Sequence, residues 1–219
     1  MLSFFRMTKG ILRKVDYYRS RFFWQNNEHK KKYRLEKWGL LNTPKCMRGL
    51  GITNLDTQNN CLLSKWLLML MNEEGTWQKL LKRKYLQNKT LSQVTKQPAD
   101  SQFWSGLMNV KDYFWARGKF EVKNGEKVRF WEDCWIGQKP LMQQYPELYN
   151  ITRKKNQTVA SVFSSLPLNI SFRRALVGEK LEMWIKLVSE IMQVGLENTK
   201  DQFVWMVNKK GRLCQCIEI

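Results

Sequence analysis

The sequence predicts an α+β fold that is mainly α, with a helical body and two β-hairpins at about 119–131 and 202–218. Apolar residues recur at helical spacing in several segments of the chain, which is typical of amphipathic helices. Two short runs with polar turn residues, at Asn124-Gly125 and near Lys209–Gly211, interrupt this pattern and predict the hairpins. With 43% hydrophobic and 13% aromatic residues among 219, the chain has enough apolar material to bury a core.

The first predicted helix covers about Lys9–Gln25, with Thr8 as its N-cap. At about 100° per residue, four apolar side chains fall within a sector of roughly 60° and predict a stripe that faces the core. They are Ile11, Val15, Tyr18 and Phe22. Because Arg13, Lys14 and Arg21 project from other faces, this helix is expected to pack against the body and still present cations.

Two further helices are expected before residue 90. The segment from about Asp56 to Asn72 is apolar enough to be buried on most sides, since only Ser64 and Lys65 are polar between Leu62 and Met71. Gly75 then separates it from a shorter helix in "GTWQKLLKRKYL".

The second half of the chain contains three more helical segments. Asp100 or Ser101 is expected to cap the first of them, in which apolar residues recur at helical spacing: Phe103, Leu107, Val110 and Phe114. The others cover about 159–165 and 179–193, and the last one has an apolar face formed by Leu181, Trp184, Ile185, Val188, Ile191 and Met192. The segment from 132 to 150 contains two prolines and is expected to be mostly irregular.

The first hairpin is the clearest local prediction. Phe120 and Val122 precede the Asn124-Gly125 pair, and Val128 and Phe130 follow it. Asn-Gly between alternating apolar residues is the signature of a type I′ turn.

Positive charge is concentrated at the N-terminus. The net charge is +19, and the first 48 residues contain thirteen Lys or Arg against three acids, a local excess of +10. Such density is typical of surfaces that meet phosphate backbones, where each neutralised phosphate releases counterions. A solvated basic surface that serves only solubility is the alternative.

Large aromatic residues are mixed with these cations, and this combination predicts nucleic-acid binding. The residues expected to contact nucleic acid are Lys9, Arg13, Lys14, Arg19, Arg21, Trp24, Lys30, Lys31, Lys32, Tyr33 and Arg34. Aromatic rings such as Trp24, Tyr33 and Trp38 would stack on bases while the lysines meet phosphates, which gives affinity without sequence specificity. Alternatively, Phe22, Trp24 and Trp38 are core anchors and only the cations face solvent.

Catalytic chemistry is not expected. A nucleotidyl transferase needs closely set carboxylates for two metal ions, and the only adjacent acids are Glu73-Glu74 and Glu132-Asp133. A metal role for the second pair is an alternative to simple polar spacing between two tryptophans. His29 is the only histidine and is interpreted as a surface residue, and no Walker-type loop or GxGxxG is present. No catalytic residue, cofactor or small-molecule substrate is therefore predicted.

The cysteines and the apolar segments bear on metal binding and location. Cys214 and Cys216 supply two of the four ligands that a structural zinc needs, so no metal is expected. Five cysteines without a secretory signal are typical of reduced intracellular thiols. The most apolar window, Cys61–Met71, has about half the length of a membrane span. These features predict an intracellular protein, nuclear or cytoplasmic, without membrane contact.

An ordered series of motifs extends over nearly the whole chain: "KGILRKVDYYRSRFFWQ", "KYRLEKWGLLNTPKCMRGLGITNL", "NNCLLSKWLLMLMNEEGTWQKLLKRKYL", "FWSGLMNVKDYF", "VKNGEKVRFWEDCWIG", "LYNIT", "SFRRALVG" and "FVWMVN". The series resembles the part of plant non-LTR (LINE-type) retrotransposon reverse transcriptases that follows the polymerase palm. The resemblance implies a basic thumb-like helical segment and loop at 1–54 and a helical connecting region at 55–200. It also implies the truncated start of a reverse-transcriptase zinc-binding segment at 201–219.

In that family the thumb grips an RNA–DNA hybrid while the palm performs the chemistry. The fingers, the palm with its Tyr-x-Asp-Asp motif and the endonuclease are absent from this sequence, so the resemblance implies a non-catalytic fragment whose partners are nucleic acid and, formerly, the missing palm and fingers. The family usually has a proline where Thr8 stands and a glycine where Arg48 stands, and "RLCQCIEI" replaces its next strand. Nucleic-acid binding is thus the leading hypothesis, and a decayed remnant without selected function is the alternative.

Overall fold

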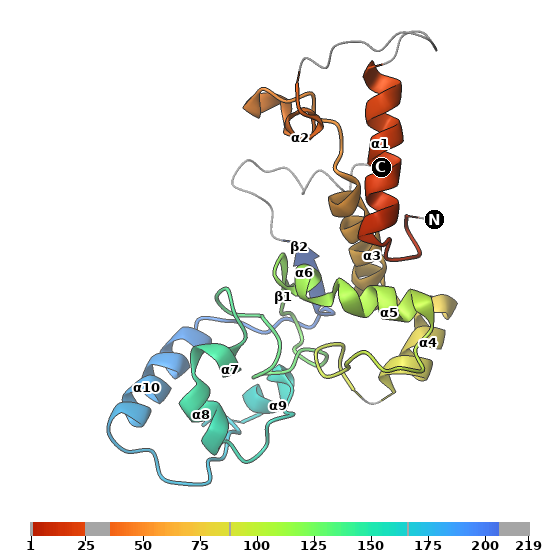
Figure 1. Ribbon diagram of the computed structural model, residues 1–219. Coiled ribbons are helices and arrows are strands. Elements are labelled where there is room, and N and C mark those ends of the chain that lie inside the picture. Colours follow the sequence, from red (N-terminus) through yellow and green to blue (C-terminus); the bar gives the residue numbers. More distant parts are fainter. Residues whose placement is uncertain (1, 25–35, 88, 166, 206–219) are drawn as a thin grey trace. The chain divides into compact units, whose positions relative to one another are not determined.

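The computed structural model describes residues 2–24, 36–87, 89–165 and 167–205 of the chain (Figure 1). The described residues form two compact units. Of the described residues, unit 1 contains 2–24, 36–67 and 96–113, and unit 2 contains 68–87, 89–95, 114–165 and 167–205. Most of the regular structure is helical and one small sheet is present, which confirms the predicted mainly α, α+β class.

Unit 1 is built from helices. They are α1 (Lys9–Trp24), α2 (Trp38–Leu41), the 3-10 helix η1 (Lys45–Met47), most of α3 (Leu55–Asn72), α5 (Gln102–Asn109) and the start of α6 (Lys111–Trp115). The predictions for α1 and α3 are confirmed to within one residue at each end. Ser101 caps α5 as expected, since its side chain accepts a hydrogen bond from the Trp104 N–H at 3.3 Å.

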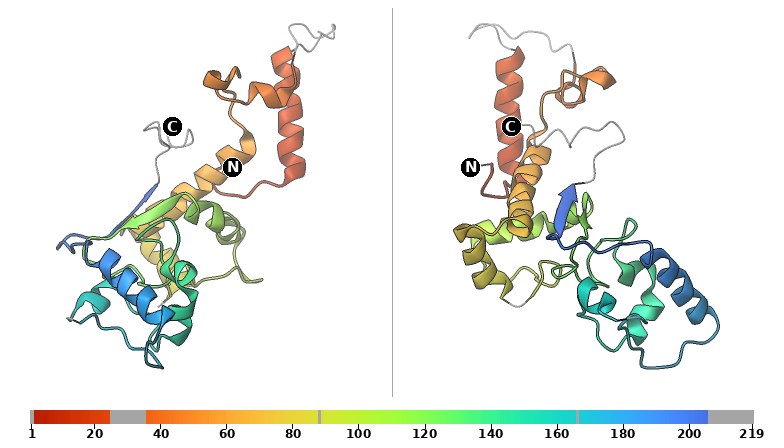
Figure 2. Two further views of the ribbon diagram at one scale, coloured as in Figure 1. Left: turned by 90° about the vertical axis from the view of Figure 1, so that its left-hand side faces the viewer. Right: turned by 180° about the vertical axis from the view of Figure 1, so that it is seen from behind.

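Unit 2 contains shorter elements around a sheet of two strands. They are the end of α3, α4 (Thr76–Leu81), the π-helix η2 (Lys82–Leu86), the end of α6, β1 (Gly118–Glu121), α7 (Leu141–Gln144), α8 (Pro146–Ile151), α9 (Val159–Phe163), α10 (Glu179–Ile191) and β2 (Gln202–Trp205). Figure 2 shows α10 beside α8. The segment expected to be irregular therefore contains α7 and α8, whereas α9 and α10 begin where the sequence predicts.

The sheet differs from the predicted hairpins in its pairing. β1 and β2 run antiparallel with Phe120 opposite Phe203. The strand predicted before the Asn-Gly turn is present, but its partner is β2 and not the segment around Val128. The second predicted hairpin begins with β2, and the rest of it lies outside the described residues.

The reason for the different pairing is Asp201. Its carboxylate accepts hydrogen bonds from the N–H groups of Lys123 and Gly125 at 2.7 and 2.8 Å, and from the N–H of Lys127 at 3.1 Å. Gly125 has a φ of +71°, and an added Cβ would lie 2.7 Å from the Ala160 nitrogen, so only glycine fits this turn. The turn thus forms around a distant carboxylate, which a local sequence pattern does not reveal.

The predicted core-facing stripe of α1 is wrong. Ile11, Val15 and Tyr18 are 49%, 38% and 55% exposed, and Phe22 is 87% exposed. The buried positions of this helix are Leu12 and Ser20. A helical wheel shows which residues share a face, but not which face the rest of the fold covers.

The apolar face of α10 is also turned from its predicted position. Leu187 and Ile191 are fully buried, while Leu181, Ile185 and Met192 are exposed. The large buried side chains of unit 2 come mainly from the segment after β1 and from α7 to α9: Phe130, Trp131, Leu141, Leu148, Val159 and Val162.

Candidate nucleic-acid interface

Helix α1, labelled in Figure 1, carries cations and aromatic residues in two neighbouring rows of its sequence. Residues four positions apart lie one above the other on a helix, with about 5–6 Å between their Cβ atoms. The first row is Lys9, Arg13, Tyr17 and Arg21, and the second contains Lys14 and Tyr18. All six side chains are exposed, and we call them the basic–aromatic face. At about 1.5 Å per residue, the first row is about 18 Å long.

The basic–aromatic face contains no acidic residue. Asp16 is the single acid of α1, and its Oδ1 accepts a hydrogen bond from Arg19 Nη1 at 2.9 Å. Within the described ranges, Lys9, Arg13 and Lys14 form no ion pair with an acid. The basic–aromatic face therefore keeps a positive field that attracts polyanions.

Arg19 lies off this face. Its Nη2 donates to the Thr53 carbonyl oxygen at 3.1 Å, and its guanidinium carbon lies 5.7 Å from the centroid of the Trp38 ring. These two interactions bind α1 to the segment that follows it in unit 1, while the Asp16 contact lies within α1. The structure thus places this predicted contact residue in a structural role.

Trp24 also lies off this face and is half-buried. Its ring meets Phe23 edge to face at 5.0 Å, and the Phe23 ring lies 6.1 Å from Trp38. The Trp24 Nε1 is buried and has no acceptor among the described residues. Trp24 and Trp38 are thus half-buried beside Phe23, whereas the exposure of Phe22 excludes the core-anchor interpretation for that residue.

The remaining predicted contacts are the cations and the tyrosine of the following segment. Lys30, Lys31, Lys32, Tyr33 and Arg34 lie outside the residues that the structure describes.

The sequence interpretation missed Tyr17 and Tyr18. Both are 55% exposed, and their rings meet edge to face with centroids 5.5 Å apart. Each stands four residues after a cation, Arg13 or Lys14, and this spacing was the available signal. Exposed rings between cations are the arrangement that stacks on bases while the flanking charges meet phosphates.

Asn59 of α3 fixes the turn that leads into α1. Its Nδ2 donates to the carbonyl oxygens of Leu2 and Phe5 at 2.6 and 2.8 Å, and its Oδ1 accepts from the Met7 N–H at 3.0 Å and from Arg6 Nη1 at 3.3 Å. The residue is fully buried. Because four hydrogen bonds converge on one buried amide, the start of α1 has a defined position on α3 within unit 1.

The part of the chain that the structure describes offers neither a metal-ligand cluster nor a membrane span. There, no three His, Cys, Asp or Glu side chains come together as metal ligands would. The same residues contain no helix with the length and apolar character needed to cross a bilayer.

Two plant proteins are similar to this chain. A putative ribonuclease H protein of Arabidopsis thaliana is 30% identical over 154 residues, which cover 65% of this chain and 24% of that protein. An uncharacterized mitochondrial protein of Arabidopsis thaliana is 24% identical over 138 residues, which cover 62% of this chain and 89% of that protein. No family model matches the chain, and no solved structure does so either. The chain thus spans about a quarter of the first relative and most of the second.

Proposed function

We propose that the chain is a non-catalytic part of a retrotransposon reverse transcriptase that binds nucleic acid without sequence preference through α1. The observation that carries this proposal is the basic–aromatic face, in which four cations and two tyrosines are exposed together. The order of the sequence motifs and the similarity to a plant protein named for ribonuclease H support a retroelement origin.

The chemistry of the face suits a phosphate backbone. Lys9, Arg13, Lys14 and Arg21 would neutralise phosphates and release counterions. Tyr17 and Tyr18 would stack on unpaired bases or pack on sugars, which every sequence offers. We propose an RNA–DNA hybrid as the ligand, since the resemblance of the sequence motifs implies a thumb-like role for α1. We also propose an intracellular location.

Binding to a fluorescent RNA–DNA hybrid at 50 and 200 mM salt tests the proposal. The affinity of the wild type is expected to fall steeply with salt. The variant R13E/K14E/R21E is expected to bind more weakly, and the slope of log affinity against log salt is expected to decrease by about three.

A control variant needs the same change in charge at a different place. Lys139, Arg173 and Arg174 are exposed and lie in unit 2. K139E/R173E/R174E should retain nearly the wild-type affinity. Equal loss in both variants, or binding that ignores salt, would refute a site on α1. Primer extension or hybrid cleavage by the chain alone would refute the non-catalytic part of the proposal.

The second candidate is a decayed remnant without selected function. The exposed apolar stripe of α1, above all Phe22, favours it, because surfaces of this kind mark lost partners or aggregation-prone chains. Broad thermal unfolding, together with hybrid binding equal in the wild type and both triple variants, would support this candidate.

A further inference from the structure

Unit 2 contains a cavity of about 240 Å³. Its walls are largely apolar, with Leu70, Leu86, Leu91 and Phe120 among the lining residues. It has a few polar groups as well, and pockets that combine apolar walls with convergent polar groups are the usual form of small-molecule sites. The cavity lies wholly within unit 2 and shares no residue with α1.

Polar groups with spare acceptor capacity line the buried part of this cavity. Asp133 is 3% exposed, and its carboxylate accepts hydrogen bonds from the Ser92 hydroxyl and, at 2.8 Å, from the Arg129 N–H. The Oγ1 of Thr90 is buried and has no hydrogen-bond partner among the described residues. An unpaired buried hydroxyl is costly, and a bound ligand with N–H groups would satisfy it.

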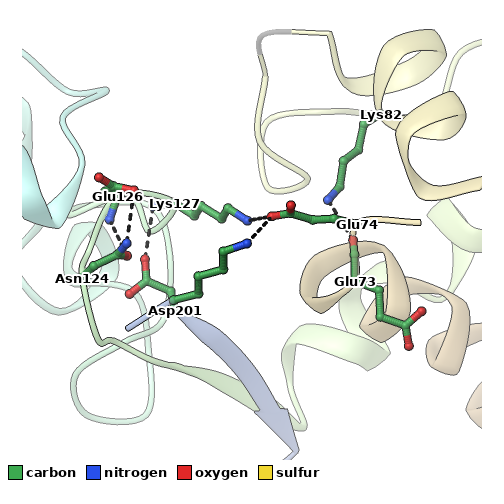
Figure 3. Close-up of polar contacts among 8 residues, drawn as sticks. Glu73, Glu74, Lys82, Asn124, Glu126, Lys127 and Asp201 are labelled. Carbon is green, nitrogen blue, oxygen red and sulfur yellow. Dashed lines mark hydrogen bonds and ion pairs between the residues drawn. The ribbon is translucent and has the colours of Figure 1, made fainter. Parts of the chain in front are cut away.

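Two lysines that line the cavity, Lys82 and Lys127, lie near Glu74 (Figure 3). Lys127 is half-exposed, and its Nζ lies 2.7 Å from Glu74 Oε1; the Nζ of Lys200 lies 3.4 Å from the same atom. Lys82 also lines the cavity and donates to the Glu73 carbonyl oxygen at 3.3 Å.

Glu74 thus occupies the place of an anion between cations. Hydrogen bonds and charge from Lys127 and then Lys200 hold the pKa of Glu74 at about 2, and burial lowers the pKa of Lys82. A phosphate carries more charge and more acceptor oxygens than one carboxylate, so it would compete well for the same lysines.

We infer that this cavity binds a nucleoside monophosphate whose base carries an amino group. The planar base would lie between the apolar walls, with its amino group donating to Asp133 and its ring near Thr90. The phosphate would take the place of the Glu74 carboxylate on Lys127 and would also contact Lys82, the second lysine that lines the cavity. This ligand goes beyond the proposed function and beyond the sequence prediction, which gave no small-molecule site.

Titration calorimetry with the full chain tests the inference. Adenosine monophosphate and cytidine monophosphate should bind more tightly than uridine monophosphate, which lacks the amino group. Adenosine and inorganic phosphate should each bind at least tenfold more weakly than adenosine monophosphate. Equal affinity for inorganic phosphate and the nucleotide would overturn the base-binding part, and no binding of any nucleotide would overturn the whole.

Four variants locate the site. E74Q removes the internal anion and should raise nucleotide affinity by about fivefold without changing adenosine affinity. K127M should lower nucleotide affinity, while K79M, at an exposed lysine of α4, should not. M71W places a large ring at a half-buried wall position and should abolish binding while circular dichroism stays native. Nucleotide affinity that is the same in E74Q, K127M and the wild type would place the ligand elsewhere.

Binding at the cavity can be tested independently of binding at the basic–aromatic face. The R13E/K14E/R21E variant should bind nucleotide as the wild type does, because its substitutions lie in unit 1. Loss of nucleotide binding in that variant would contradict a cavity site, whatever the result with the hybrid.

Discussion

The Nδ2 of Asn59 donates to the carbonyl oxygen of Phe5 at 2.8 Å, across 54 positions of sequence. The same buried amide makes three further hydrogen bonds to the turn before α1. Removing a buried partner leaves the other groups unpaired, which costs about 1–3 kcal/mol for each group. We expect N59A to lower the free energy of unfolding by at least about 2 kcal/mol, as measured by urea denaturation.

The neighbouring Asn60 provides the control for this prediction. It is an amide on the same helix that is only partly buried. N60A should therefore change stability by less than about 0.5 kcal/mol. Equal effects of the two substitutions would mean that the turn does not depend on Asn59.

Asp201 should be as important for the stability of unit 2 as Asn59 is for the stability of unit 1. Its carboxylate accepts three backbone hydrogen bonds from the turn at 123–127, and bonds to a charged group contribute about 1.5–3 kcal/mol each. D201A is expected to destabilise unit 2 by about 3 kcal/mol or more. It should also accelerate hydrogen exchange at the amides of Lys123, Gly125 and Lys127.

D201N is the matched control, since it keeps one carbonyl oxygen for two of the three donors. It should be less destabilising than D201A, because only the Lys127 N–H would face the new amide group. Unchanged exchange at the three amides in D201A would contradict the role that we assign to this carboxylate.

Arg48 is expected to be a weak point of unit 1. It ends η1 in the left-handed region, with φ of +64°, and this conformation costs a non-glycine residue about 1–2 kcal/mol. R48G should therefore raise the free energy of unfolding by about 1 kcal/mol. R48A, which keeps the Cβ, should not raise the free energy of unfolding. An equal rise in R48G and R48A would assign the effect to the lost charge.

Tyr17 and Tyr18 should contribute to affinity without contributing to its salt dependence. If each ring stacks on a base, Y17A/Y18A loses about 1–3 kcal/mol of binding free energy per stacked base. The affinity for a single-stranded oligonucleotide should therefore fall about tenfold or more. The slope of affinity against salt should stay the same, because no cation is removed. Y85A, in unit 2, should leave both quantities unchanged.

Asp133 should make stability depend on pH. Burial raises the pKa of its carboxyl from 3.8 to about 6, so the folded state holds this proton more tightly than the unfolded state. The stabilising effect of the proton is therefore complete below about pH 4 and is lost as the pH rises to about 6, by about 3 kcal/mol at most.

D133N should remove this dependence, with the new amide group facing Ser92 and the oxygen facing the Arg129 N–H. Urea unfolding at pH 4 and pH 6.5 measures the difference for the wild type and the variant. D112N, at an exposed position of α6, serves as the control. The same pH dependence in the wild type and D133N would assign the titration to another group.

Elements with strong periodicity were predictable from the sequence. The bounds of α1, α3 and α10 agree closely with the prediction, because their apolar spacing extends over several turns. The orientation of these helices was not predictable, since the exposed stripe of α1 and the rotated face of α10 depend on which segments pack against them.

Features formed by residues distant in the sequence could not be predicted from local patterns. The sheet joins Phe120 to Phe203, and the cavity combines Leu70, Asp133 and Asp201. On α1, the exposure of Tyr17 and the partial burial of Trp24 were not predictable, because large aromatics beside cations look alike until their burial is known.

The uncovered apolar stripe of α1 has a practical consequence for handling the protein. Cations on the adjoining face repel a second copy of the protein at low ionic strength. Added salt weakens this repulsion, because charges separated by more than the Debye length, about 10 Å at 0.1 M salt, are largely screened. Concentrated samples should therefore form oligomers as salt increases, which light scattering would detect. Hybrid titrations at high salt consequently need nanomolar protein, so that weaker binding of the hybrid is not confused with self-association of the protein.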